Sequence, residues 1–284
     1  MHHMIQAIGA PFKTEWSSNS YRSPETFSWT KDSSEIQVYI DSALVSGSRT
    51  PKTNKKFGWF CESRIVRHSV FADITQSVHK YKQAYHKIFT CDQELLSLDP
   101  DLFVFAFAGS NLPWTPVDEY GLYRKTKMVS LLASANTSTE GHRNRIKMSE
   151  KFRDFSVDFY GGIFGSPKIG ISGNEHYHHK RKTESLNDYM FSITIENCKY
   201  DTYFTEKVTD CFANGTIPIY YGTNKICDYF DKDGIIFLND KFTPSQLTKE
   251  LYDSKLEYVQ KNLELVKKMR GSDDYLFDKI KEII

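Results

Sequence analysis

The chain has 284 residues, 39% of them hydrophobic and 26% charged, and a formal net charge of +1. This length fits either one large domain or two ordinary domains, each with a core of its own. Because positive and negative charges nearly cancel, we exclude a general affinity for nucleic acid and expect any basic site to be local.

The cysteines and the N-terminus indicate the cellular environment to expect for the protein. Five cysteines are widely separated and form no C-x-x-C pair, which argues against a disulfide framework and a structural zinc site. The N-terminus lacks a basic stretch followed by an apolar one, and no apolar run approaches the roughly 18 residues that span a bilayer. We therefore expect a cytoplasmic, soluble protein without a transmembrane segment.

Short apolar runs along the chain predict strands. These runs are residues 36–41, 56–60, 86–91, 101–108, 127–134, 156–161, 191–196, 216–222 and 234–239. Most are continuous rather than alternating, which is typical of parallel strands covered on both faces. Helical patterns occupy residues 143–155, 203–214 and 244–269, the last as one or two amphipathic helices. This alternation predicts the α/β class.

An irregular segment at residues 108–127 contains two prolines and interrupts the alternation. We expect it to link two α/β domains, residues 1–120 and residues 121–284, each with four or five strands. A second irregular stretch, residues 161–184, has five glycines. It reads as a long loop of the second domain, and loops of that length are usually functional or mobile.

Charged residues stand between a strand and a helix in "IENCKYDTYFTEKVTDCFANGTIPIYYG", residues 195–222. Glu196 and Asn197 follow the strand, at the edge where open parallel sheets bind ligands. Glu206 and Lys207 fall in the first helical turn, where free N–H groups and Lys207 favour a phosphate or diphosphate. Glu206 can accept hydrogen bonds from vicinal sugar hydroxyls. The alternative is that Glu206 only complements the helix dipole and Lys207 is solvated.

Residues 134–152 repeat this arrangement. A polar loop leads into a helix in which Arg145 lies about one turn from the start, and its guanidinium could hold a phosphate in a bidentate fork. The alternative is a surface helix with a basic start. In the first half, Glu62 follows the strand at 56–60. A carboxylate at a strand end usually caps the backbone or is solvated, but Glu62 could be catalytic if it faced a cleft.

Three clusters of acidic residues or histidines could be taken for metal sites. They are Asp99 with Asp101, Asp231 with Asp233, and His176 with His178 and His179. Both acidic pairs precede apolar runs and lie near proline or glycine, so we predict turns. Adjacent histidines rarely converge on one ion, so we predict a polar loop and no metal site.

Taken together, residues 191–222 resemble the signature of the α-1,3-fucosyltransferases, glycosyltransferase family 10, which reads E-N-S/T, Y-x-T-E-K and G-x-x-P-x-x-x-G. The matching positions are Glu196, Asn197, Tyr203, Thr205, Glu206, Lys207, Gly215, Pro218 and Gly222. A weaker resemblance places Arg145 at a phosphate-binding arginine and "GWFCES" at a strand that ends E-S-P. Cys198 and Arg64 depart from the family pattern, which has Ser or Thr and Pro at these positions.

The resemblance implies a GT-B architecture, in which two Rossmann-like domains face each other and the C-terminal one holds the donor GDP-fucose. It implies an inverting transfer of L-fucose to a glycan hydroxyl, with no cofactor required. The implied donor-binding residues are Arg145, Glu196, Asn197, Tyr203, Glu206 and Lys207. Of these, Arg145 and Lys207 would neutralise the diphosphate and Glu206 would bind hydroxyls, while Glu62 would be the general base. A transferase for another GDP-sugar, such as GDP-mannose, and a nucleotide- or glycan-binding module without turnover remain alternatives.

Overall fold

The computed structural model describes residues 2–9, 22–52, 55–109, 111–161 and 182–284. Contacts divide the chain into two compact units, each built around a parallel sheet. Unit 1 comprises Met1–Asn111, Tyr200–Tyr203 and Arg270–Ile284, and unit 2 comprises Leu112–Lys199 and Phe204–Met269. The predicted α/β class is confirmed. The histidines His176, His178 and His179, predicted to lie in a polar loop without a metal ion, are outside the described residues.

The division falls at Asn111 and Leu112, ahead of the predicted boundary at residue 120. The reason is that Trp114 and Thr115 donate their backbone N–H groups to Asp210 of unit 2, at 2.7 and 3.2 Å. The irregular segment therefore packs as part of unit 2 for most of its length.

The sheet of unit 1 has six strands in the order β2-β1-β3-β4-β5-β6, and all the described pairs are parallel. Its strands are β1 His3–Ile8, β2 Phe27–Thr30, β3 Ile36–Ile40, β4 Lys56–Phe60, β5 Ile88–Thr90 and β6 Phe103–Phe105. Its helices are α1 Ala43–Gly47, α2 His68–Gln76, α3 Val78–Ala84, α4 Gln93–Leu98 and α10 Ser272–Lys281. One core cluster joins the strands to α10 and another joins them to α1–α4.

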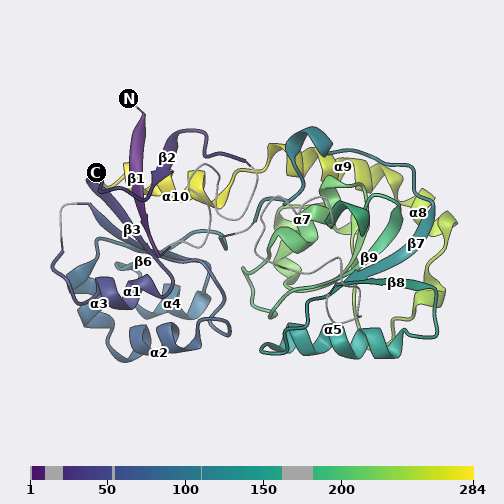
Figure 1. Cartoon of the computed structure of the whole chain (residues 1–284), viewed down its shortest axis with the longest axis horizontal. Helices are drawn as coiled ribbons and strands as arrows, with labels where there is room; N and C mark the ends of the chain where they lie inside the picture. Colours follow the sequence, from purple (N-terminus) through teal and green to yellow (C-terminus); the bar gives the residue numbers. More distant parts are fainter. Residues whose placement is uncertain (1, 10–21, 53–54, 110, 162–181) are drawn as a thin grey trace. The chain divides into compact units, whose positions relative to one another are not determined.

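Helix α10 completes the core of unit 1 although it lies at the end of the chain. Figure 1 shows it in yellow beside the purple strands β1 and β2. Leu276, Phe277 and Ile280 are at most 1% exposed, and burial of such side chains contributes about 1.5–3 kcal/mol each relative to exposure. Asp273 also accepts a hydrogen bond from the indole of Trp29 at 2.7 Å.

The sheet of unit 2 has five strands in the order β11-β10-β9-β7-β8, again all parallel. Its strands are β7 Lys127–Leu132, β8 Val157–Tyr160, β9 Tyr189–Ile195, β10 Ile217–Tyr221 and β11 Ile236–Phe237. Its helices are α5 Glu140–Lys151, α7 Glu206–Ala213, α8 Lys249–Ser254 and α9 Leu256–Lys268, with the 3-10 helices η1 Val117–Glu119, η4 Asn224–Asp228, η5 Lys232–Gly234 and η6 Pro244–Gln246.

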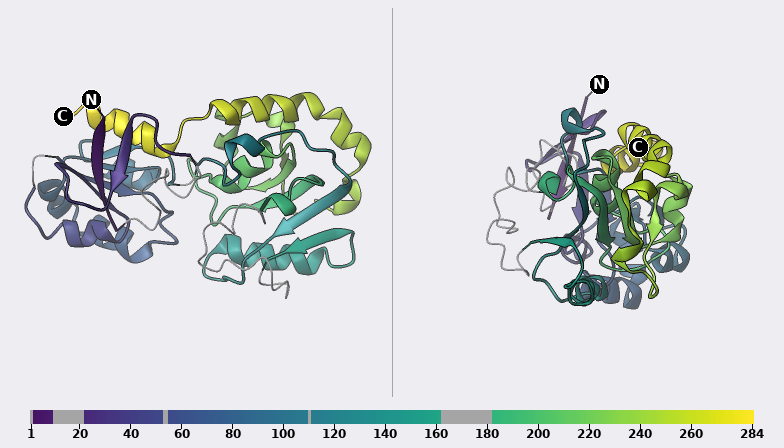
Figure 2. Two further views of the ribbon diagram at one scale, coloured as in Figure 1. Left: turned by 45° about the horizontal axis from the view of Figure 1, so that its top comes forward. Right: turned by 90° about the vertical axis from the view of Figure 1, so that its right-hand side faces the viewer.

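The strand order of unit 2 reverses between β7 and β9. From β7 the chain passes through α5 to β8 on one side, and from β9 it passes through α7 to β10 on the other. Because such crossovers are right-handed, the two helices lie on opposite faces of the sheet; Figure 2 (left) shows the strands between α5 below and α7 with α9 above. This reversal makes a topological switch point, where ligands bind in open α/β sheets.

All nine predicted strands are confirmed, as are the three helical regions, with the last forming α8 and α9. The expected count of four or five strands in the first domain is wrong, because β1 and β2 were not predicted. Their apolar residues alternate with partly exposed ones, so neither forms a continuous apolar run. Within the described residues no helix combines the length and apolarity needed to cross a membrane.

A lysine ammonium ties together separate parts of unit 2. Lys125 donates to the backbone oxygens of Leu186, Asn187 and Asn214 at 3.2, 3.0 and 2.6 Å, and to the hydroxyl of Thr216 at 3.0 Å. Asn214 caps the end of α7 and Thr216 precedes β10. The ammonium therefore joins the end of α7 to the segments that enter β9 and β10.

Replacing Lys125 with Met should lower the free energy of unfolding by about 2–4 kcal/mol, because three carbonyl groups lose their donor. Denaturation in urea measures the change. The matched control is Lys127→Met on the same segment, whose side chain is 45% exposed and which should cost less than about 1 kcal/mol. Equal stability of the two variants would show that the Lys125 contacts do not stabilise unit 2.

Candidate functional site

A cavity of about 240 Å³ opens at the switch point of unit 2. It is lined by the ends of β7 and β9 and by residues from the first turns of α5 and α7. Its volume is slightly below the range of about 300–1,000 Å³ that is usual for small-ligand sites. Four of the predicted donor-binding residues line it together: Arg145, Asn197, Glu206 and Lys207.

Helix α5 approaches the end of β9 closely. A Cβ atom on Gly141 would lie 1.8 Å from the carbonyl oxygen of Glu196, so a side chain there would collide with the strand end. The N–H of Gly141 donates to the carbonyl of Asn197 at 3.1 Å. Glycine therefore permits the first turn of α5 to lie against the segment that carries Asn197.

Arg145 points from α5 toward the same strand end. It is 6% exposed, and its Nε and Nη2 donate to the carbonyl of Ile195 at 3.0 and 2.5 Å. Nη2 also donates to Oδ1 of Asn197 at 2.9 Å. The bidentate geometry that we predicted for a phosphate is thus used on the carbonyl of Ile195, and phosphate binding by Arg145 stays a prediction.

His142 lines the cavity beside Arg145, and sequence reasoning missed it. The N–H of Thr139 and its hydroxyl lie 3.3 and 2.7 Å from Nδ1 of His142, so this atom accepts and the proton resides on Nε2. Burial, with the charges of Arg145 and Lys207, lowers the pKa of His142 to about 4. The ring is therefore neutral at pH 7. Position N3 of the helix after an N-cap threonine was the available signal.

Glu196 anchors the start of α7 instead of lining the cavity. It is fully buried, and its two carboxylate oxygens accept from the N–H and the hydroxyl of Thr205, each at 2.8 Å. Nζ of Lys207 lies 3.7 Å from Oε2 of Glu196 and 3.0 Å from the Thr205 hydroxyl. Burial raises the pKa of Glu196 and Lys207 opposes this.

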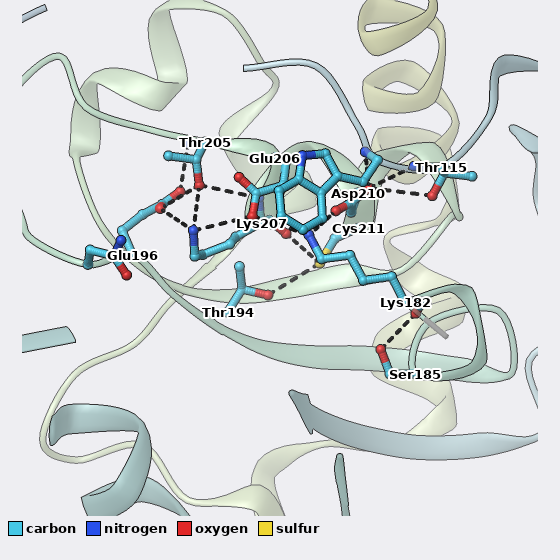
Figure 3. A network of polar contacts seen from close by, with 12 residues as sticks. Thr115, Lys182, Ser185, Thr194, Glu196, Thr205, Glu206, Lys207, Asp210 and Cys211 are labelled. Carbon is cyan, nitrogen blue, oxygen red and sulfur yellow. Dashed lines mark hydrogen bonds and ion pairs between the residues drawn. The ribbon is translucent and has the colours of Figure 1, made fainter. Parts of the chain in front are cut away.

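Figure 3 shows a continuous polar network along one side of α7. Nζ of Lys182 lies 3.3 Å from Oε1 of Glu206 and pairs more closely with Oδ2 of Asp210. Nζ of Lys207 lies 3.3 Å from the same Oε1 of Glu206. Burial lowers the pKa of Lys182, but Asp210 and Glu206 outweigh it and leave this pKa raised. The donor-side carboxylate Glu206 is thus held between two ammonium groups.

Glu62 belongs to unit 1, as does Tyr203. Oε2 of Glu62 lies 3.4 Å from the hydroxyl of Tyr203 and accepts the N–H of Ser63 at 3.3 Å. Tyr203 is buried and is not among the residues that line the cavity of unit 2, so its predicted place in the donor pocket stays a prediction.

The turn that carries Glu62 is held by Asp41. Oδ1 of Asp41 accepts the N–H groups of Cys61 and Glu62 at 2.9 and 3.2 Å, and Nε of Arg67 lies 3.2 Å from Oδ2. The backbone of Asp41 has φ +47°, a conformation that costs a non-glycine residue free energy. This carboxylate therefore fixes the backbone of Cys61 and Glu62, directly after the end of β4.

The predicted acidic turns are confirmed. Asp99 accepts the N–H groups of Asp101 and Leu102, and Asp231 accepts the N–H of Asp233. In the part of the chain that the structure describes, no group of three or more His, Cys, Asp or Glu side chains is placed to hold a metal ion.

Comparison with known proteins identifies the C-terminal part. Residues 122–267 match the model of glycosyltransferase family 10 (fucosyltransferase), C-terminal part. The chain is 30% identical over 138 residues to alpha-(1,3)-fucosyltransferase B of Drosophila melanogaster; the match covers 47% of this chain and 30% of the relative. The chain thus spans less than a third of that protein's length.

Solved structures show the fold of the whole chain. An alpha1,3-fucosyltransferase matches with a TM-score of 0.51 at 13% identity, over 99% of this chain and 88% of that one. A structure of alpha1,3-fucosyltransferase with GDP matches with a TM-score of 0.50, with the same identity and coverage. The predicted GT-B fold is confirmed.

The neutral His142 predicts a dependence of stability on pH. Its pKa is lowered in the folded state, so between pH 6.5 and 4 the unfolded chain binds the proton first and the folded state loses stability as the pH falls. His142→Gln keeps a capping-box side chain but does not titrate. From pH 7 to pH 5 the parent should lose about 1–2 kcal/mol more than the variant. Parallel pH profiles of unfolding free energy would contradict this assignment.

Proposed function

Because the chain belongs to glycosyltransferase family 10 (fucosyltransferase), we propose that it transfers L-fucose from GDP-fucose to a glycan hydroxyl with inversion at the anomeric carbon. The observation that carries this proposal is the meeting of Arg145, Asn197, Glu206 and Lys207 at one cavity of unit 2. The relatives with this fold support it, since one is an alpha1,3-fucosyltransferase solved with GDP.

The cavity suits a nucleoside diphosphate sugar. Helices α5 and α7 both contribute lining residues from their N-terminal halves, and the dipole of each helix favours an anion near its N-terminus. In the proposal, Arg145 and Lys207 stabilise the diphosphate, and Nε2–H of the neutral His142 adds a hydrogen-bond donor. Glu206 accepts hydrogen bonds from donor hydroxyls, which a fixed carboxylate can do in pairs.

In the transfer step, the acceptor oxygen forms a bond to the anomeric carbon while the bond from that carbon to the β-phosphate oxygen breaks. The bonding electron pair leaves with GDP, and the acceptor proton passes to the carboxylate of Glu62. Positive charge develops on the sugar ring, as in glycoside hydrolysis, and negative charge develops on the leaving diphosphate. Arg145, Lys207 and the two helix N-termini stabilise that negative charge.

The base role of Glu62 predicts the kinetics of Glu62→Gln. Because the amide cannot take the acceptor proton, kcat should fall by about 100-fold or more, while the Kd for GDP stays within twofold. GDP release is measured with GDP-fucose and with GDP-mannose across mixed glycan acceptors, and only GDP-fucose should support turnover. Glu35→Gln is the matched control, since this side chain is 70% exposed. Transfer by Glu62→Gln at the parental rate would refute the role of Glu62 as the base. If the parent turned over GDP-mannose but not GDP-fucose, the donor would be GDP-mannose instead.

Lys207→Met separates binding of phosphate from binding of the nucleoside. The variant should bind GDP about tenfold or more weakly, because one cation is lost beside the diphosphate, whereas guanosine should bind as it does to the parent. Calorimetric titration of both ligands gives the two ratios. Lys225→Met, an exposed lysine of the same unit, should change neither. Equal losses for GDP and guanosine would assign Lys207 to the structure of the site instead of to the diphosphate.

A further inference from the structure

We propose that Lys182 is a positioning residue of the donor site: it keeps Glu206 and Asp210 ionised together and fixes the orientation of the Glu206 carboxylate toward donor hydroxyls. This inference rests on the proposed function. Lys182 had no part in the sequence-based site, since it lies within the irregular stretch at residues 161–184, which has no helical or strand periodicity.

The first step of the argument is the geometry. Lys182 bridges the two carboxylates, with Oε1 of Glu206 3.3 Å from its Nζ and Oδ2 of Asp210 closer still (Figure 3). The side chains of Lys182, Glu206 and Asp210 are 11%, 6% and 1% exposed. Ion pairs this buried are poorly screened by solvent, so removal of one member leaves an uncompensated charge.

The second step is that Lys182 is itself fixed. Asp210 accepts the N–H groups of Trp114 and Thr115 on its other oxygen, at 2.7 and 3.2 Å. The Trp114 ring lies 4.3 Å from the Lys182 ammonium, measured to the ring centroid, a favourable cation–π distance. The ammonium therefore sits between an anchored carboxylate and an aromatic face, and this arrangement defines where Oε1 of Glu206 is held.

The third step concerns charge. Glu206 and Asp210 are four residues apart on α7, so they share one face of the helix. Without Lys182, two buried carboxylates would be neighbours and one would take up a proton, as like charges in a dry site do. A protonated Glu206 would lose part of its capacity to accept hydrogen bonds.

Lys182 acts through Glu206 rather than on the donor phosphates. Both lysines lie near two carboxylates, but the side chain of Lys182 is 11% exposed, compared with 24% for Lys207, and Lys182 pairs more closely with Asp210 than Lys207 does with either of its carboxylates. Two cations on one carboxylate thus have different tasks: Lys207 is the one with access to an anion, and Lys182 is the one that holds the carboxylate in place.

The test is Lys182→Met, with GDP-fucose and inorganic pyrophosphate as probes. GDP-fucose should bind about tenfold or more weakly, because the buried Glu206 and Asp210 then lack their shared cation and one of them takes up a proton. Pyrophosphate carries no hydroxyl and should bind within threefold of the parent. The double variant Lys182→Met/Asp210→Asn removes one charge of each sign and should recover most of the GDP-fucose affinity. Loss of affinity for both probes, or no recovery in the double variant, would overturn the inference.

A second readout needs no ligand. In Lys182→Met the crowded carboxylates should have a raised pKa in the folded state, so the folded state binds a proton that the unfolded chain releases. Its Tm should therefore fall as pH rises from 5.5 to 8, relative to the parent and to the double variant. A Tm profile parallel to that of the parent would overturn the inference.

If the parent does not bind GDP-fucose, the proposed function fails, but the Tm profile still decides whether Lys182 keeps both carboxylates ionised. If the single variant does not fold, Lys182→Arg, which keeps the charge, should fold and retain affinity; an arginine variant that folds without affinity would also overturn it.

Discussion

The site depends on one buried carboxylate. Glu196 ends β9 and holds Thr205 at both oxygens, although eight residues lie between them. Part of that excursion, Tyr200–Tyr203, packs with unit 1. Since Glu196 fixes Thr205, and Thr205 caps α7, the chain can leave unit 2 and still begin the helix at a set place. These two hydrogen bonds set the positions of Glu206 and Lys207. They therefore give a reason for the full burial of Glu196 directly after a strand.

Charges around the cavity are largely balanced within the chain. The cations are Arg145, Lys182 and Lys207, and the carboxylates near them are Glu196, Glu206 and Asp210. On the proposed function, the dipoles of α5 and α7 add to the field of these side chains at a bound diphosphate. The doubly wound order of the sheet matters here, because it brings two helix starts to one edge from opposite faces.

The sequence was sufficient to predict the features that local patterns determine. Continuous apolar runs identified both sheets except for β1 and β2, whose alternation was too short to separate from an irregular segment. Residue types that follow strands, in loops and near the starts of the next helices, pointed to Arg145, Asn197, Glu206 and Lys207, and all four line one cavity. The sequence could not show that Glu196 would turn inward to Thr205, or that Tyr203 would pack in unit 1, because both depend on the path of the chain through three dimensions. Lys182 and Asp210 were missed for the same reason, since they are far apart in the sequence, whereas His142 was missed although its local signal, position N3 after Thr139, was present.

The course of the chain also bears on how the protein is made. Unit 1 begins at the N-terminus, yet the face of its sheet that carries Trp29 and Trp59 is covered by α10, which is translated after all of unit 2. During synthesis that apolar face stays uncovered until the whole of unit 2 and then α10 have been translated. The newly made first half is therefore the part of this protein with the longest exposure to chaperones and to aggregation.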